Sequence, residues 1–598
     1  MSTIVEKKFR IWQPFVIVMS LFALFLIPKL FQDPMPRAGL ENGIVASRLI
    51  PGETPFWELT NDATLQELDE IAYMPLGYWM ESVAMHFFGD STYFDVWYSF
   101  AFFIIAAILL FFTWINLGNA PRSFWVPMLL YLVVPIILRS STANYIEMPF
   151  TVILLLSTLI YVRGISKTLR DTGHGEHAEM RKLSNPSRKY TFGRAFNMIW
   201  VGLMLSTGFM IKGVTGIFPI ILPFLVWCLD PNRKGNWRPF LDLGIIVTVM
   251  ILLNVILILI DPAMPESIRA YRVSLRSGAL AHSTSVASHF YILYQALVQL
   301  LIPIAVCFLV FIPKMLEHKL KKYAFYWKYQ DDLSNSEVRL ITIGHACMIT
   351  GFVGIVVSSY SLRQYDYYIL PTLPYFIMGL ACYSVQSSEL MLSKVTKLSS
   401  TLLSIVGFVF PVAAILMFMN AMFSSRDNGS AVSELHRMLP YLEQNENVGV
   451  GQSVMPNSVE ALHMRRHRNV TLQPDKFNRH LLLKFDEYYR LPRKNDFKEV
   501  ELGNSIYHLY ECANPALLGK GFYDRDLPPE VTNSKQQVTD TAPVTDTVKD
   551  HMRPGEEFVD PMYIRRTRAA HEAALKDKSK KDKPKSGTDL ERQMIHKD

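Results

Sequence analysis

The chain has 598 residues, of which 50% are hydrophobic and 19% are charged, and its formal net charge is +7 at pH 7. The mean hydropathy of +0.17 averages two populations, long charge-free runs and a charged final third. A water-soluble protein does not carry such runs. Four of the five cysteines lie in apolar runs and Cys512 stands alone, so the sequence indicates neither a disulfide framework nor a cysteine metal site.

The apolar runs predict about eleven transmembrane helices, because most of them approach or exceed the roughly 17–25 residues that cross a bilayer. They cover 12–28, 96–121, 123–138, 148–162, 195–211, 213–229, 243–260, 290–313, 340–362, 367–388 and 398–425. Lipid offers no partner to an unpaired backbone group, so we expect helices. The first run lacks a small-residue cleavage site, which favours an anchor over a cleaved signal peptide.

The basic residues predict the orientation. If the N-terminus, with Lys7, Lys8 and Arg10, is cytoplasmic, alternate loops hold most of the basic charge, namely 163–194, 233–238 and 314–339. The opposite loops, 33–95, 139–147, 261–289 and 360–366, are poorer in Lys and Arg, which is the positive-inside pattern. The short basic clusters are explained by this topology, so nucleic-acid binding is not indicated. An odd number of spans also places the C-terminal region outside.

The C-terminal third predicts two further parts. Residues 426–520 combine an amphipathic stretch at 433–442, a short strand at 447–451 and an alternating strand at 505–510, which indicates a small α/β domain. Residues 521–598 are rich in Pro, Thr, Asp and Lys and cannot bury a core, so we expect a disordered charged tail. The transmembrane domain then covers 1–425, with 33–95 as its first outer loop.

Five segments together resemble a known family. They are "LENGIVASRLI", "YMPLGYWMESVAMHFFGDS", "ANYIEMPFTVILLL", "GFMIKGVTGIFPIILPFLVW" and "SLRQYDYYILPTLPYFIMGL". In order and spacing they look like the landmarks of type C glycosyltransferases, and they resemble those of bacterial protein O-mannosyltransferases and of the aminoarabinose transferase of lipid A. The resemblance covers roughly residues 10–390. It implies an all-α polytopic membrane enzyme with a small extracytoplasmic α/β domain.

The resemblance also implies a reaction and its partners. A sugar would pass from a polyprenyl-phosphate carrier to a lipid, polysaccharide or protein acceptor on the outer face of a bacterial inner membrane. Such a displacement needs a carboxylate to take the acceptor proton and positive charge to stabilise the leaving phosphate. A divalent metal ion can share the second role. The sequence specifies neither the donor sugar nor the acceptor.

Two carboxylates are the catalytic candidates. Glu41 occupies the place of the acidic pair that opens the first outer loop in the family; the alternative is a solvated loop acid. The family usually has Asp immediately before it, whereas this chain has Leu40. Glu147 lies at the outer end of a predicted span. A carboxylate at this place is energetically costly unless it belongs to a functional site or forms an ion pair. Its alternative is an interfacial acid paired with Arg139.

Four cations are the candidates for the donor phosphate. Lys212 lies in the Lys-Gly turn that resembles the family's, although a lone Lys can also extend to the interface. Arg272 and Arg276 belong to a cationic outer loop, and Arg363 precedes a pair of tyrosines. Guanidinium groups suit phosphate, and the alternative for Arg363 is a membrane anchor.

Aromatic residues predict a substrate groove, and three residues are the candidates for a metal. Tyr78, Trp79, Tyr367 and Tyr368 can line the groove, or belong to an interfacial aromatic belt; Pro75 to Trp79 favours the start of a surface helix. Relatives carry a charged residue directly before this Pro, where the chain has Met74. The metal candidates are His282, Asp69 and Glu70.

Two other classes of function remain open. A secondary transporter is less favoured, because the two halves of the chain show no matching pair of broken spans. A noncatalytic relative that binds a lipid-linked glycan or scaffolds an envelope complex is supported by Leu40 and Met74, where charged residues are expected.

Overall fold

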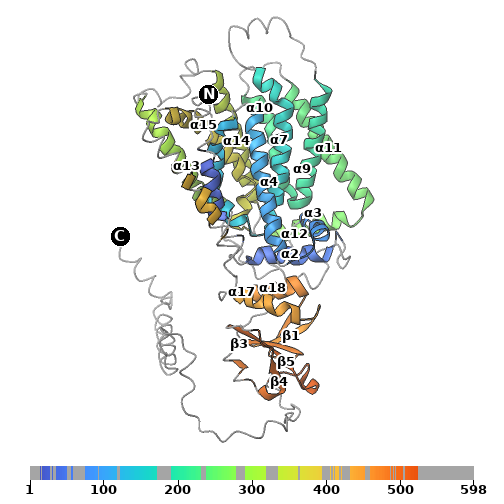
Figure 1. Ribbon diagram of the computed structural model, residues 1–598. Helices are drawn as coiled ribbons and strands as arrows, with labels where there is room; N and C mark the ends of the chain where they lie inside the picture. The colour runs from blue at the N-terminus through green and yellow to red at the C-terminus, as the bar shows by residue number, and fades with distance from the viewer. Residues whose placement is uncertain are drawn as a thin grey trace, which may run out of the picture. The chain divides into compact units, whose positions relative to one another are not determined.

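The computed structural model gives a mostly helical chain with a small sheet region (Figure 1). It describes residues 14, 16–26, 30, 35–49, 56–57, 74–91, 93–117, 121–171, 190–229, 237–277, 290–317, 335–360, 364–393, 405, 408–409, 411–416, 419, 431–451, 458–484, 487–488, 491, 493–502 and 506–522. All of these belong to one compact unit, Met1–Glu530. The tail predicted at 521–598 therefore lies almost wholly outside the described residues.

The helical part contains long and short helices. In chain order they are α2 (Arg37–Leu49), α3 (Leu76–Phe88), α4 (Phe94–Asn116), η2 (Pro121–Phe124), α5 (Trp125–Leu132), α6 (Pro135–Ser140), α7 (Glu147–Asp171), α9 (Phe192–Lys212), η3 (Gly213–Ile221), α10 (Leu222–Leu229), α11 (Arg238–Ile260), α12 (Met264–Ser277), α13 (Tyr291–Glu317), α14 (Asn335–Ser358), η7 (Asp366–Ile369) and α15 (Leu373–Ser393).

Five helical segments within the described residues are long and apolar enough to cross a membrane. They are Phe94–Asn116, Glu147–Ile165, Phe192–Leu229, Arg238–Ile260 and Tyr291–Phe308. Only 11% of the α11 window is buried, and Leu259 and Ile260 are among its most exposed side chains. A helix that is apolar on every side and so poorly covered by protein fits lipid rather than water.

One predicted run is a broken helix, and the predicted runs at 195–211 and 213–229 form one helical segment with a turn between them. The run at 123–138 forms η2, α5 and α6, and the break falls just before Pro135, which cannot continue the helix. The segment Phe192–Leu229 turns at Gly213, where φ is +59°, and η3 folds back on α9. Gly208 and Gly216 permit this contact, because a Cβ on Gly216 would lie 2.2 Å from the Gly208 backbone. The run at 398–425 lies largely outside the described residues, and the number of eleven spans stays a prediction.

The core of the bundle follows from helix pairing. Helix α7 packs between α4 and α9, α9 also packs on α11, and α15 contacts α5, α13 and α14. Trp114 of α4 is fully buried, and its indole N–H donates a hydrogen bond of 3.0 Å to Ser123 Oγ. α2, α3 and α12 lie together at one end of the bundle (Figure 1), and α3 contacts α4 and α9 there.

The sheet region contains five strands in the order β2-β1-β3-β5-β4. Their bounds are β1 (Asn447–Val450), β2 (Thr471–Pro474), β3 (His480–Lys484), β4 (Phe497–Glu499) and β5 (Tyr507–Cys512). β1 pairs in parallel with β2 and β3, whereas β5 is antiparallel to β3 and β4. The predicted strands at 447–451 and 505–510 correspond to β1 and β5.

Helices cover this sheet. They are α17 (Ala431–Met438), η8 (Leu439–Tyr441), α18 (Val459–Arg468), η9 (Lys494–Asp496) and η10 (Pro515–Leu517). α17 and η8 fill the stretch predicted to be amphipathic. Val448, Val450, Leu482 and Leu509 from the strands pack with Leu435 and Met464 from the helices. Helix α18 also contacts α2, so the sheet region meets the bundle at the end that carries α2 and α3.

Candidate functional site

The five segments that carry the family resemblance meet at one end of the bundle. Asn42 of α2 donates a 2.9 Å hydrogen bond to the Asn144 carbonyl, and a Cβ on Gly77 of α3 would lie 2.9 Å from Ile146 and 3.3 Å from Ile211. The first, second, third and fourth segments therefore touch directly. The fifth segment joins them through Tyr368, whose ring lies 3.6 Å from Lys212 Nζ.

A buried ion pair lies at this junction. Lys212 Nζ, at the last residue of α9, donates to Glu147 Oε1, at the first residue of α7. Their side chains are 6% and 1% exposed. A buried charged group is costly unless it is paired, so each of these two side chains serves as the partner of the other. Arg139, which the alternative interpretation pairs with Glu147, forms an ion pair with Asp366.

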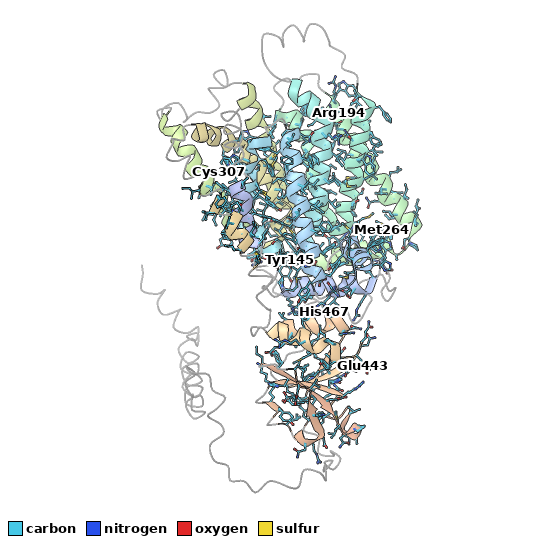
Figure 2. The ribbon with its side chains drawn as sticks, viewed as in Figure 1. Tyr145, Arg194, Met264, Cys307, Glu443 and His467 are labelled. Carbon is cyan, nitrogen blue, oxygen red and sulfur yellow. The ribbon has the colours of Figure 1, made fainter. Side chains whose placement is uncertain are left out.

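Aromatic rings surround the pair. Tyr367 and Tyr368 are both buried, and Tyr367 stacks with Tyr145 at 4.1 Å between ring centroids. Tyr145 lies at the end of the bundle near α2 (Figure 2). The hydroxyl of Tyr271, on α12, donates a 2.8 Å hydrogen bond to the Lys212 carbonyl and so covers the turn at Gly213. The cation of Lys212 is thus held against a ring face within an aromatic wall.

Glu41 lies on the buried side of α2. Its side chain is 1% exposed, and Arg37, one turn earlier, donates a 2.7 Å hydrogen bond from Nε to Glu41 Oε1. The neighbouring Leu40 is also 1% exposed and packs in the main apolar core. Glu41 is therefore a desolvated, paired carboxylate and not a solvated loop acid.

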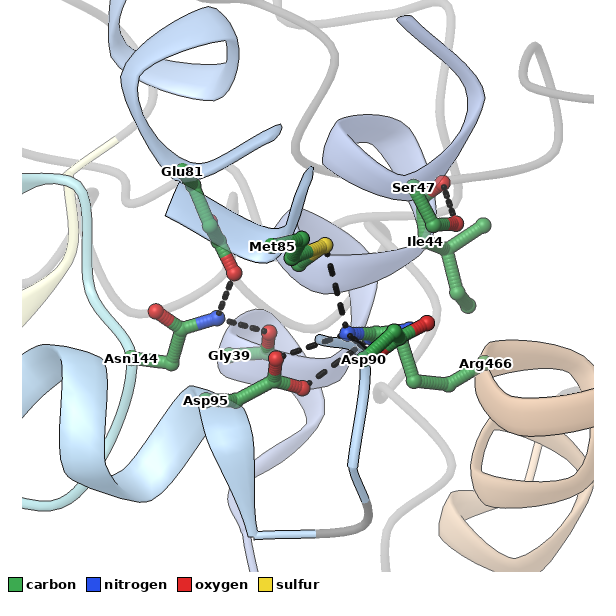
Figure 3. A network of polar contacts seen from close by, with 9 residues as sticks. All are labelled: Gly39, Ile44, Ser47, Glu81, Met85, Asp90, Asp95, Asn144 and Arg466. Carbon is green, nitrogen blue, oxygen red and sulfur yellow. Dashed lines mark hydrogen bonds and ion pairs between the residues drawn. The ribbon is translucent and has the colours of Figure 1, made fainter. Parts of the chain in front are cut away.

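Asn144 connects α2, α3 and the segment that leads into Glu147 (Figure 3). Its side-chain amide donates to the Gly39 carbonyl at 3.1 Å and to Glu81 Oε1 at 2.6 Å. Asn42 in turn donates to the Asn144 carbonyl at 2.9 Å. Asn144 has φ of +50°, a left-handed conformation that Asn tolerates better than most residues. These bonds fix the backbone three residues before Glu147.

A second charged group lies beside Asn144. Arg466 of α18 reaches Asp95 at 2.8 Å and Asp90 at 2.8 Å, and its side chain is fully buried (Figure 3). Burial raises the pKa of Glu81 well above its ordinary value, and the negative charge of Asp95 raises it further. The charges of Asp90 and Asp95 raise the pKa of Arg466 despite its burial. The arginine thus ties the sheet region to α4 as a charged clamp.

The remaining predicted site residues fall into two groups. Tyr78 is fully buried in α3, whereas Trp79 beside it is 43% exposed, and α3 begins at Leu76 directly after Pro75 as expected. Arg272 lies on the exposed side of α12, and Arg276 belongs to the same helix, its side chain outside the described residues. Arg363, His282, Asp69 and Glu70 also lie outside the described residues.

Glu81, Asp95, Asn144 and Arg466 belong to the site but are not among the residues predicted from the sequence. A signal for Glu81 exists: Tyr78, Glu81, Ser82 and Met85 share one helical face, and that face is buried. The pairing of Arg466 with Asp95 joins residues 371 positions apart and has no local signal in the sequence.

A cavity of about 300 Å³ adjoins the charged clamp. Its wall comes from α2, α3 and α18 and carries Arg48, Arg465 and Arg468 beside Arg466. Arg48 donates a 2.5 Å hydrogen bond to Asn469 Oδ1. Asp90 is the one carboxylate in this wall among the described residues, so the cavity presents an excess of positive charge.

Comparison with known proteins gives structural neighbours only, because no family model and no curated protein matches the sequence. ArnT from Cupriavidus metallidurans, in a crystal structure bound to undecaprenyl phosphate, is similar with a TM-score of 0.48 and 11% identity, over 85% of this chain and 99% of ArnT. The archaeal oligosaccharyltransferase AglB from Archaeoglobus fulgidus, in complex with an inhibitory peptide and a dolichol-phosphate, is similar with a TM-score of 0.38 and 12% identity. The similarity covers 79% of this chain and 69% of AglB.

With TM-scores below 0.5 and such low identity, the likeness assigns neither membership nor activity to this chain, and the case for a function rests on its own residues.

Proposed function

We propose that this protein is an integral membrane glycosyltransferase that passes a sugar from a polyprenyl-phosphate donor to an envelope acceptor. One observation carries the proposal: five segments spread over more than 300 residues converge and bury Glu41, Glu147 and Lys212 at one end of the bundle. Buried ionisable groups beside membrane spans are costly and mark functional sites.

Glu41 is the proposed general base. It accepts the proton of the acceptor hydroxyl while that oxygen attacks the anomeric carbon of the sugar. The bond between this carbon and the phosphate oxygen breaks, and its electron pair leaves with the lipid phosphate. Arg37 Nε lies 2.7 Å from Glu41 Oε1 and so fixes the position of this carboxylate.

Lys212 is the proposed partner of the leaving phosphate. Its ammonium group is held by Glu147 and by the ring face of Tyr368, so its position does not depend on a bound ligand. A preorganised cation stabilises charge that develops on the phosphate. Glu147 is then a positioning residue for Lys212. Arg272, on the exposed side of α12, is proposed to attract the donor phosphate at the membrane surface.

A second candidate is a noncatalytic relative that binds a lipid-linked glycan. It is favoured by Leu40 and Met74, which are each 1% exposed and pack in apolar clusters where the family resemblance implies charged side chains. A buried leucine and a buried methionine cannot perform the roles of the residues they replace.

Mass spectrometry of envelope glycolipids and glycoproteins, from cells with and without the gene, separates the two functions. If the protein is a glycosyltransferase, a sugar-modified species should be absent from cells without the gene and should return when the wild-type gene is restored. It should not return with Lys212→Met at equal protein level. If the two profiles are identical under conditions in which the protein is produced, the noncatalytic function is supported.

A further inference from the structure

Three histidines gather between α17 and α18, outside the groups discussed so far. His463 and His467 are four residues apart on α18, so they share one face of the helix, and His436 comes from α17. One ligand nitrogen from each ring lies within 4.8 Å of the other two. The ring centroid of His436 lies 5.4 Å from that of His463 and 5.4 Å from that of His467.

His463 is the centre of this cluster. Its side chain is 4% exposed, and neither of its ring nitrogens has a hydrogen-bond partner among the described residues. A buried polar atom without a partner costs about 1–3 kcal/mol. A neutral imidazole in this setting has a free lone pair, which is the form that binds a transition metal.

We propose that His436, His463 and His467 form a binding site for a zinc-type divalent ion. The proposal is independent of the glycosyltransferase function. Zinc takes imidazole nitrogens at about 2.0–2.1 Å, which places tetrahedral ligands about 3.3 Å apart, so the rings need only small rotations to close on an ion. Three protein ligands leave a fourth position for an oxygen ligand.

The surroundings of the cluster are compatible with a cation. Arg466, next to His467 in sequence, is already paired with Asp90 and Asp95, which offset its charge. His467 also lies in the wall of the 300 Å³ cavity, so the cluster borders that cavity. A bound ion would cross-link α17 to α18 and so order the helices that cover the sheet.

Metal binding by the purified full-length protein tests the proposal. The wild-type protein, stripped with chelator and reloaded, should retain one zinc per chain and give the visible absorption of tetrahedral Co(II). His463→Ala should lower the Co(II) affinity by more than roughly 100-fold, since loss of a group that only supports a ligand already costs 10–100-fold. His86→Ala is the matched control, because His86 lines the same cavity but lies outside the cluster.

Zinc should also raise the melting temperature of the wild-type protein and of His86→Ala, but not that of His463→Ala or His467→Asn. Wild-type protein that takes up no stoichiometric zinc and shows no tetrahedral Co(II) spectrum overturns the proposal, whatever the variants do. The proposal also fails if both cluster variants bind Co(II) as tightly as the His86 variant.

Discussion

Individual charged side chains are buried at the junction of α2, α3, α7 and α18, and each depends on a named partner. Glu81 is the most unusual of them, because its carboxyl faces the like charges of Asp90 and Asp95 as well as Asn144 and Arg466. Its raised pKa means that the folded protein holds a proton there at pH values at which the unfolded chain has lost it. Such a group makes stability depend on pH.

Glu81→Gln should therefore flatten the pH dependence of stability. Below the ordinary glutamate pKa of 4.5, Glu81 is neutral in both the folded and the unfolded chain. Its contribution to the stability of the folded protein is then fully present. That contribution is lost as the pH rises through the raised pKa of the folded state. Melting temperatures in detergent from pH 4 to 9 should fall more steeply for wild type than for Glu81→Gln. Glu266→Gln, an exposed site on α12, should follow wild type; parallel curves for all three proteins would contradict the prediction.

Arg466→Met should destabilise the contact between the sheet region and the bundle. Removing one partner of a buried ion pair leaves the other charge uncompensated and typically costs about 3–5 kcal/mol. Arg479→Met is the control, since its pair with Glu443 is solvent-exposed. Chemical unfolding should show a large loss for Arg466→Met and little change for the control. Restoration of stability by adding Asp95→Asn would show that the stranded carboxylate causes the loss.

Among the elements, α2 is held by two glycines one turn apart. A Cβ on Gly39 would meet the Ala143 carbonyl at 2.1 Å, and one on Gly43 would meet Arg466 Nε at 2.5 Å. The glycines let α2 approach both the segment before Glu147 and the charged clamp. Helix propensity alone disfavours Gly here, so the close approach explains its presence.

Gly39→Ala should lower stability, because the carbonyl that it meets belongs to the backbone and cannot rotate away. Overpacking of this kind typically costs about 1–3 kcal/mol. Gly244→Ala in the interior of α11 has nothing within 4 Å of its added Cβ and should be neutral or stabilising by about 0.5–1 kcal/mol. Equal melting temperatures for the two variants would show that α2 can shift freely.

The elements also show how far the sequence could predict the structure. Apolar runs predict spans from composition alone, and α4, α7, α9 and α11 match theirs because a membrane span is a local property. The five sequence segments predict Glu41, Glu147, Lys212 and Tyr368 as site residues. The hydrogen bond of Asn144 with Glu81 and the ion pair of Arg466 with Asp95 join residues that are far apart in the sequence, so no local sequence pattern predicts them.

On the scale of the whole molecule, the segments predicted to lie outside occur at one end of the bundle, together with the sheet region. α2, α3 and α12 lie there, and so does the contact of α18 with α2. The membrane face that this end meets stays a prediction from the Lys and Arg pattern. That prediction puts the sheet region and the basic loop at 163–194 on opposite sides.

Reporter fusions should detect this arrangement. A reporter placed after residue 450 should behave as extracytoplasmic, and one inserted between residues 170 and 190 should behave as cytoplasmic. Fusions with the same behaviour at both places would move the proposed chemistry to the other face of the membrane.

The most direct measurement for the proposed function is sugar transfer by purified protein supplied with polyprenyl-phosphate-linked donors and an envelope extract. Glu41→Gln keeps the shape of the side chain and removes its charge, so it should lower the transfer rate by about 10²-fold or more, while the protein still folds. Glu58→Gln and Glu67→Gln should transfer at the wild-type rate. Full activity of Glu41→Gln would show that Glu41 is not the general base. The absence of any transfer product from the wild-type protein would contradict the proposed glycosyltransferase function.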